Sequence, residues 1–141
     1  MCIRDSTTRA CFFDDEFVFN ADGSFQNVQQ GETWLEAWQG VMADECGVPV
    51  APHDGSNAAT WEFDASEGTL TLNGLGAHLG LPKVINGSEI DNPANASNSI
   101  TYDVAFDGDN MIVDINFGAG FWRYTMERSA SSSVLLSLIH I

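Results

Sequence analysis

The sequence predicts an all-β protein: an antiparallel meander that closes as a lipocalin-like up-and-down barrel, with a β-sandwich as the alternative. Three observations support this prediction. Apolar and polar residues alternate with a period of two through most of the chain, as they do in half-buried strands. Short turns rich in Asp, Asn and Gly join the alternating segments. With 141 residues, the chain is long enough for one domain with its own core.

Predicted hairpins supply most of the strands. In the first hairpin, the aromatic residues 17, 19 and 25 share one face if the turn is tight, and Asp22-Gly23 provides the positive φ that such a turn needs. Two more pairs of alternating segments follow the same plan. The three hairpins comprise residues 17–20 with 24–28, residues 61–64 with 69–73, and residues 100–106 with 111–117. We expect a last strand at residues 121–127 and a weaker strand at residues 78–85.

Short turns pair each strand with the next, and a meander of about eight strands either closes on itself or leaves two exposed edges. Two stretches interrupt the alternation. Residues 31–43 carry Leu35, Trp38 and Met42 at near-helical spacing, which predicts a short helix or helical turn. Residues 46–58 and 86–98 are rich in Pro, Gly, Asp and Asn, and we expect both to be loops.

The two ends of the sequence are related at the level of DNA. Residues 1–6 back-translate to ATG TGT ATA AGA GAC AG, whose reverse complement, CTG TCT CTT ATA CAC AT, encodes residues 136–141 when one more base is supplied. Two ends of a natural gene have no reason to be reverse complements, and both resemble the transposon-end adapter of sequencing libraries. We therefore expect residues 1–6 and 136–141 to be adapter-derived, residues 7–128 to form one β-barrel-like module, and residues 129–135 to be a linker or artefactual tail. If this cut removed a first strand, the barrel has an open edge.

Cysteine pairing follows from this exclusion, because Cys2 belongs to the adapter. Cys11 and Cys46 remain, and an even pair suits a disulfide in an extracellular or cell-surface protein; two buried free thiols are the alternative. We expect no metal or cofactor. The sequence has no Cys-x-x-Cys, and His53 and His78 are not spaced as zinc ligands. Calcium at the acidic segments around residues 14–16 and 107–114 is the alternative to solvated carboxylates.

The charge balance restricts the partners. The sequence has 20 acidic and 5 basic residues, for a formal net charge of −15. Such a surface repels phosphate backbones and anionic lipid, so we expect neither nucleic acid nor a membrane as a partner. No apolar run approaches the roughly 20 residues that a spanning helix needs.

A segment with two tryptophans and two glutamates supplies the candidate ligand-binding residues. Residues 31–40 read Gly-Glu-Thr-Trp-Leu-Glu-Ala-Trp-Gln-Gly, and indole rings offer flat apolar faces to sugar rings. We therefore single out Trp34, Trp38, Glu32, Glu36 and Gln39 as ligand-binding, with core packing as the alternative for the tryptophans. The two glutamates would project the same way from one helix, whereas a glycosidase needs carboxylates on both sides of the scissile bond. We expect no catalytic residue in this chain.

Several long strings resemble a known module. They are residues 9–16, Arg-Ala-Cys-Phe-Phe-Asp-Asp-Glu; residues 19–25, Phe-Asn-Ala-Asp-Gly-Ser-Phe; residues 32–40; residues 51–55, Ala-Pro-His-Asp-Gly; and residues 72–74 with 80–83. Across residues 9–126 the chain resembles a module of secreted marine Bacteroidetes proteins that is often found beside family-16 glycoside hydrolase domains. Such modules usually begin with one more, tryptophan-bearing strand. The family-16 pattern Glu-x-Asp-x-x-Glu is absent here, so the resemblance implies that any β-glucanase activity belongs to the parent protein.

Three functions remain to be compared. The first is a non-catalytic carbohydrate-associated module of a secreted polysaccharide-degrading protein, monomeric within a larger chain and binding a polysaccharide such as a β-glucan. It requires exposed aromatic rings. The second is a lipocalin-like binder of a small apolar ligand, which requires a deep, unfilled lumen. The third is a glycoside hydrolase in its own right, which requires two carboxylates converging in a cleft.

The charge balance gives a first testable prediction. Self-repulsion at −15 destabilises a small domain in dilute buffer, and added salt screens this repulsion. The melting temperature should therefore rise between dilute buffer and seawater-like salt, as followed by circular dichroism. A constant or falling melting temperature would remove the physical support for a saline extracellular habitat.

Overall fold

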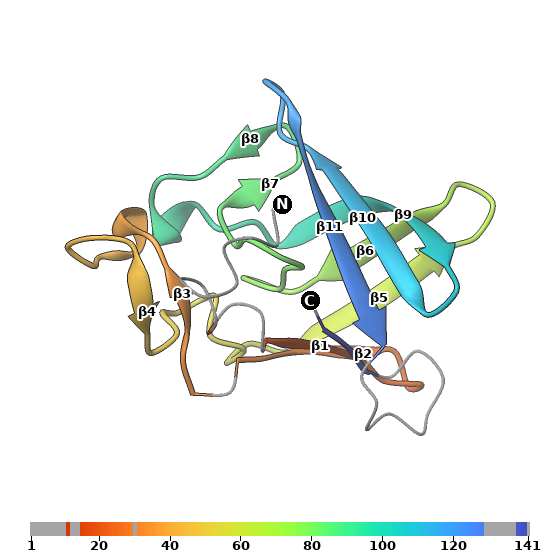
Figure 1. The fold of residues 1–141 in the computed structure, drawn as a ribbon, viewed down its shortest axis with the longest axis horizontal. Helices are drawn as coiled ribbons and strands as arrows, with labels where there is room; N and C mark the ends of the chain where they lie inside the picture. The colour runs from red at the N-terminus through yellow and green to blue at the C-terminus, as the bar shows by residue number, and fades with distance from the viewer. Residues whose placement is uncertain (1–10, 12–14, 30, 129–137, 141) are drawn as a thin grey trace.

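The computed structural model describes residues 11, 15–29, 31–128 and 138–140, and it shows an all-β protein built on one strongly curled antiparallel sheet (Figure 1). Seven strands form the half-barrel of this sheet: β1 (Glu16–Phe19), β2 (Ser24–Val28), β5 (Ala59–Asp64), β6 (Thr69–Asn73), β9 (Ser99–Asp107), β10 (Asn110–Asn116) and β11 (Phe121–Arg128). They pair in chain order, so the predicted meander and its three hairpins are confirmed. A three-residue strand, β12 (Leu138–His140), pairs with both β11 and β1.

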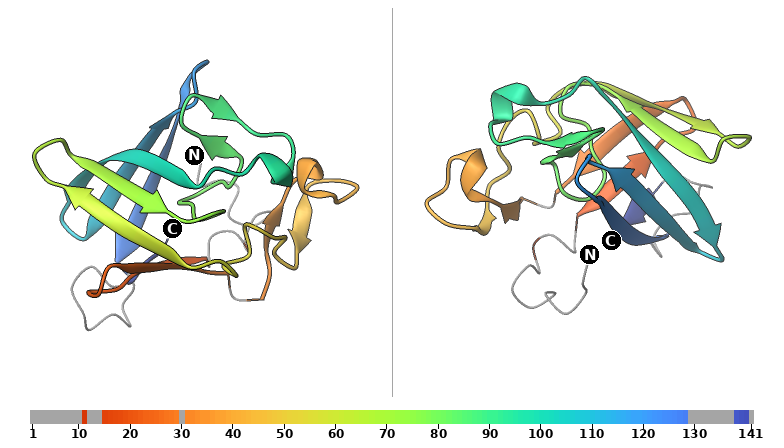
Figure 2. Two further views of the ribbon diagram at one scale, coloured as in Figure 1. Left: turned by 180° about the vertical axis from the view of Figure 1, so that it is seen from behind. Right: turned by 90° about the horizontal axis from the view of Figure 1, so that it is seen from above.

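Two small hairpins are inserted between these strands. The first pairs β3 (Thr33–Leu35) with β4 (Glu45–Gly47), and the second pairs β7 (Val84–Ile85) with β8 (Ser88–Glu89). Single 3-10 turns, η2 (Ala37–Gln39) and η3 (Pro93–Asn95), lie in the same connections. The β3–β4 hairpin stands to one side of the curled sheet, and the β5–β6 turn lies on the opposite side in all views (Figure 2).

The short helix or helical turn predicted within residues 31–43 is confirmed only as the single turn η2. Thr33, Trp34 and Leu35 are all buried, and they form a strand because β4 pairs with them. Met42, which completed the helical spacing, is fully exposed, so no apolar stripe exists on which a helix could pack. The turn ends at Gly40, whose φ of 103° is left-handed. The predicted loop at residues 46–58 is correct except that β4 extends into it.

The strand predicted at residues 78–85 forms only over its last two residues. The stretch before it, residues 76–82, is entirely buried and is called the plug. The Leu79 amide donates to the Tyr102 hydroxyl (2.9 Å) and the Leu81 amide donates to the Tyr124 hydroxyl (3.3 Å). The alternating pattern therefore reflects burial against the sheet's inner face, with tyrosine hydroxyls in place of a neighbouring strand.

The plug fills the interior of the curled sheet. It contributes Leu79 and Leu81 to one continuous core, which is completed by inward-facing side chains of the strands. The largest fully buried side chains are Tyr102, Tyr124, Phe17, Phe25, Leu72, Leu79, Leu81, Ile115, Met126, Val84 and Val113. Burying apolar side chains of this size stabilises the fold by roughly 1.5–3 kcal/mol each.

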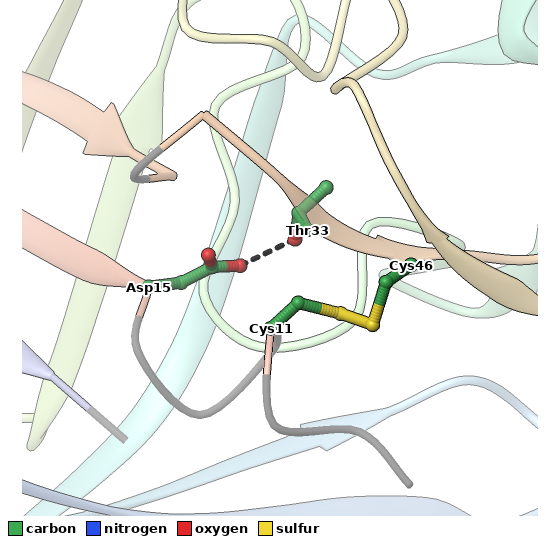
Figure 3. Close-up of a disulfide and its surroundings, with 4 residues drawn as sticks. All are labelled: Cys11, Asp15, Thr33 and Cys46. Atoms are coloured by element: carbon green, nitrogen blue, oxygen red, sulfur yellow. Dashed lines mark hydrogen bonds between the residues drawn. A yellow bond between two sulfur atoms is a disulfide. The ribbon is translucent and has the colours of Figure 1, made fainter.

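The predicted disulfide between Cys11 and Cys46 is confirmed (Figure 3). It ties β4 to the chain just before β1, across 35 positions of sequence. A second link lies beside it, where the Thr33 hydroxyl of β3 donates to the buried Asp15 carboxylate at 2.5 Å. The β3–β4 hairpin is therefore linked at two points to the chain that precedes β1.

A glycine of the plug gives a prediction about its packing. A Cβ at Gly80 would lie 2.4 Å from the Tyr124 ring, and φ there is 72°, so Gly80→Ala should cost about 3 kcal/mol or more. Gly108→Ala is the matched control, because φ is 62° but no described atom lies within 4 Å of its Cβ; it should cost about 1 kcal/mol. Urea unfolding measures both losses. Equal losses would show that the plug does not press on Tyr124.

Candidate functional site

Five side chains from four separate segments meet at one rim of the sheet, and we call them the rim cluster: Glu36, Trp38, Lys83, Glu89 and Trp122. The Trp38 indole donates to Glu36 Oε1 (3.2 Å), and the Trp122 indole donates to Glu89 Oε2 (2.9 Å). Lys83 Nζ lies 3.6 Å from Glu36 Oε1 and 4.0 Å from Glu89 Oε2. A continuous chain of polar contacts thus joins two indole rings through two carboxylates and one ammonium group.

Lys83 is the centre of this cluster and the sole lysine of the sequence. Its ammonium lies 5.6 Å from the centre of the Trp122 ring, within the range of a cation–π interaction. The side chains of Lys83 and Glu36 are only 23% and 13% exposed, so water screens this pair less than a fully exposed pair. The cluster is therefore a preorganised arrangement rather than a set of mobile surface charges.

The strand pairing explains the position of Trp122. It lies opposite Ile115 and shares the inner face of the sheet with Tyr124, on which it stacks at 6.4 Å with an interplanar angle of 5°. Trp122 is partly exposed, whereas Tyr124 is buried. One face of the indole is supported by the core, and the ring edge is bonded to Glu89.

Two buried histidines lie beneath Trp38. The His53 ring packs edge-to-face against Trp38 at 5.7 Å and against His78 at 5.6 Å. Burial lowers the pKa of His53 to about 4, although Asp54 raises it. Burial, and then the charge of His53, lower the pKa of His78 to about 3. His78 Nδ1 lies 2.8 Å from the Gly76 carbonyl, so this nitrogen carries the proton of the neutral ring.

The five residues predicted to bind ligand do not share one environment. Trp38 and Glu36 belong to the rim cluster, whereas Trp34 is 7% exposed and packs in the core. Gln39 is buried, and its side-chain oxygen accepts from the Glu36 amide (3.2 Å), which stabilises η2. Glu32 is exposed and makes no hydrogen bond or ion pair with another described residue. Ligand binding by these residues stays a prediction.

Sequence reasoning did not single out Lys83, Glu89 or Trp122. Lys83 carried a signal, because a single lysine in so acidic a chain is unusual. The parity of Trp122 relative to Tyr124 was available, but the inner face of the strand could not be identified without the register. Glu89 carried no signal, since it lies in a polar stretch that resembles any solvated loop.

The described part of the chain contains no candidate metal site. Within it, no group of three or more His, Cys, Asp or Glu side chains is placed to hold an ion. Of the acidic residues considered for calcium, Asp114 forms a bidentate pair with Arg123 (2.8 and 2.9 Å), and Asp14 lies outside the described residues. No helix of the described residues is long and apolar enough to cross a membrane.

The chemistry of the rim cluster suits binding of a polyhydroxylated ligand. Partly exposed indoles supply apolar faces, and the carboxylates and ammonium supply hydrogen-bond acceptors and donors. Comparisons with known proteins do not add to this geometry: no protein-family model, no curated protein and no solved structure matches the chain.

The buried histidines predict a loss of stability in mild acid. Their folded-state pKa values lie below the ordinary value of 6.5, so the unfolded chain binds protons that the folded chain excludes. Stability should therefore fall as the pH drops from about 6.5, by about 2 kcal/mol per histidine between pH 7 and pH 5. Four aspartates also have lowered pKa values, but they change the stability mainly near and below pH 3.8, outside this window. They are Asp22, Asp54, Asp64 and Asp114.

Urea unfolding of wild type and His53→Gln at pH 7 and pH 5 measures this loss. The variant should lose about 2 kcal/mol less than wild type between the two pH values, because one titrating group is gone. Equal losses would mean that His53 is not held neutral by burial.

Proposed function

We propose that the chain is a non-catalytic carbohydrate-associated module and that its rim cluster binds a polysaccharide such as a β-glucan. The observation that carries the proposal is the pair of partly exposed indoles, Trp38 and Trp122, held at one rim by Glu36, Lys83 and Glu89. Sugar rings stack on indoles through their C–H faces, and charged side chains bond their hydroxyl groups. Because the site is already ordered, binding has little side-chain freedom to remove.

The position of Lys83 favours binding over hydrolysis at this site. A glycosidase needs a proton donor and a second carboxylate on either side of a scissile bond. Here Lys83 contacts both carboxylates of the cluster, so an ammonium group stands between them. The catalytic activity of a parent polysaccharide-degrading protein would then lie in another domain. This chain would act as a monomeric module of that larger secreted protein. The Cys11–Cys46 disulfide supports an extracellular or cell-surface location.

We further propose that the curled sheet is a lipocalin-like up-and-down barrel. The support is that the seven-stranded sheet curls so far that β12 pairs with both of its edges, β1 and β11. Because β12 lies within residues 136–141, which we expect to be adapter-derived, it marks the place of the strand that the proposed barrel lacks. A lipocalin-like binding function has less support than the fold, because the plug occupies the interior where an apolar ligand would lie.

The proposal predicts that retention on β-glucan depends on the rim tryptophans. Trp38→Ala and Trp122→Ala should each reduce retention on insoluble or gel-embedded β-glucan, because each removes one stacking face. Phe121→Ala is the matched control. Phe121 precedes Trp122 in the sequence, is 63% exposed and does not belong to the rim cluster, so this substitution should leave retention unchanged. Affinity electrophoresis measures retention, and a thermal melt accompanies each variant.

Retention and melting together distinguish the outcomes. Lost retention with an unchanged melt supports a binding platform at the rim. A loss of several kcal/mol in stability for Trp38→Ala is what truncation of a core tryptophan produces, and it would contradict the carbohydrate interpretation of Trp38. Trp34→Ala should show that loss, because Trp34 is buried.

A further inference from the structure

The one ammonium group of the rim cluster lies between two carboxylates. Lys83 Nζ is 3.6 Å from Glu36 Oε1 and 4.0 Å from Glu89 Oε2, so negative formal charge is in excess in the cluster. The side chains of Glu36 and Glu89 are only 13% and 33% exposed, and water therefore screens their charges less than those of freely exposed groups. A ligand at this rim meets a site whose positive charge is already neutralised.

Other cations in the described part of the chain do not offset this excess. Arg123 is the only further Lys or Arg side chain whose surroundings the structure describes, and it forms a bidentate pair with Asp114 (2.8 and 2.9 Å). The two histidines beneath Trp38 stay neutral at neutral pH, because burial lowers the pKa of His53 to about 4 and that of His78 to about 3. The excess negative charge of the rim cluster therefore persists under physiological conditions.

Hydrogen bonding within the cluster leaves acceptors for a ligand. The indole N–H of Trp38 donates to Glu36 Oε1 (3.2 Å), and that of Trp122 donates to Glu89 Oε2 (2.9 Å), so both indole donors are already used. Each carboxylate has about four acceptor positions on its two oxygens, of which the indole bond uses one. Sugar hydroxyls can donate to the remaining positions, whereas ionised uronate and sulfate groups have no proton to donate.

We propose that the rim cluster binds polysaccharides without uronate or sulfate groups and that Glu36 and Glu89 determine this selectivity. Hydroxyl groups donate to the two carboxylates in charge-assisted bonds, while an acidic substituent would lie next to two fixed negative charges. Lys83 does not compensate for this repulsion, because its ammonium already lies between those charges. The inference rests on the proposed function and adds to it the substrate class and the two residues that select it.

Matched neutral and anionic polymers test the selectivity. Hydroxyethyl and carboxymethyl derivatives of cellulose and of curdlan give two pairs of β-glucans with different linkages, and only the carboxymethyl derivatives carry carboxylates. Affinity electrophoresis at neutral pH should show that the wild-type protein binds the neutral member of a pair about tenfold more tightly than the anionic member. Added salt should reduce this difference, because it screens the charges.

A double variant assigns the selectivity to the two glutamates. Glu36→Gln/Glu89→Gln keeps the size of both side chains and one acceptor oxygen on each, and it removes the two negative charges beside Lys83. The difference between neutral and anionic polymers should fall to about threefold or less. Thermal melts report whether the fold is intact. If the double variant does not fold, Glu89→Gln alone, at the more exposed of the two positions, should still narrow the difference.

A matched control separates the local charge from the charge of the whole chain. Asp107→Asn/Asp109→Asn removes the same two charges from an exposed turn. This turn precedes β10, whereas the partner of Trp122 in β10 is Ile115, near the other end of that strand. The difference between the polymers should therefore stay near tenfold, at about the wild-type value.

The possible results distinguish this inference from the proposed function. Retention by none of the four polymers would contradict the proposed function and this inference with it. Equal retention by neutral and anionic polymers would overturn the inference alone, as would an unchanged difference in the glutamate variants. A control variant that narrows the difference as much as Glu36→Gln/Glu89→Gln would show that the charge of the whole chain, rather than the rim cluster, excludes acidic polysaccharides.

Discussion

Two hydrogen bonds from the plug to buried tyrosines organise the molecule. A backbone segment that crosses an apolar interior needs partners for its amides, because an unpaired buried amide costs about 1–3 kcal/mol. Tyr102 and Tyr124 meet this need for Leu79 and Leu81, and burial raises the pKa of both phenols, which keeps them protonated. The position of Lys83 follows, since it is the first residue after the plug. The same geometry allows β7 and β8 to pair and to bring Glu89 to the rim.

The plug also makes the two ends of the sheet chemically different. At the rim it supports a polar cluster over buried histidines, and the indoles of that cluster stand at the edge of a filled interior. At the opposite end, the strands extend beyond the plug, and aromatic rings on the inner face of the sheet are partly exposed. The rim end therefore combines indole rings with charged groups, whereas the far end exposes aromatic rings without charged groups in their lining.

Much of the fold was predictable because it is specified locally. Alternation and Asp-Gly turns located the strand pairs, and the exclusion of Cys2 left one pairing for Cys11 and Cys46. The plug was not predictable, since His78 to Leu81 alternate as a strand does and only distant tyrosines decide their partners. Only part of the rim cluster was predictable from the sequence, because some of its residues are distant along the chain. Trp38 and Glu36 are close in sequence, whereas Lys83, Glu89 and Trp122 join them only through the register of the sheet.

The central claim is that the plug is an integral part of the core and not a surface connection. Amide hydrogen exchange of Leu79 and Leu81 tests this claim most directly, because both amides are bonded only to tyrosine hydroxyls inside the sheet. We predict that they exchange as slowly as amides in the centres of β9 and β10, through global unfolding. Exchange at the rate of exposed loop amides, while the strands remain protected, would show that the plug opens independently and would contradict the account.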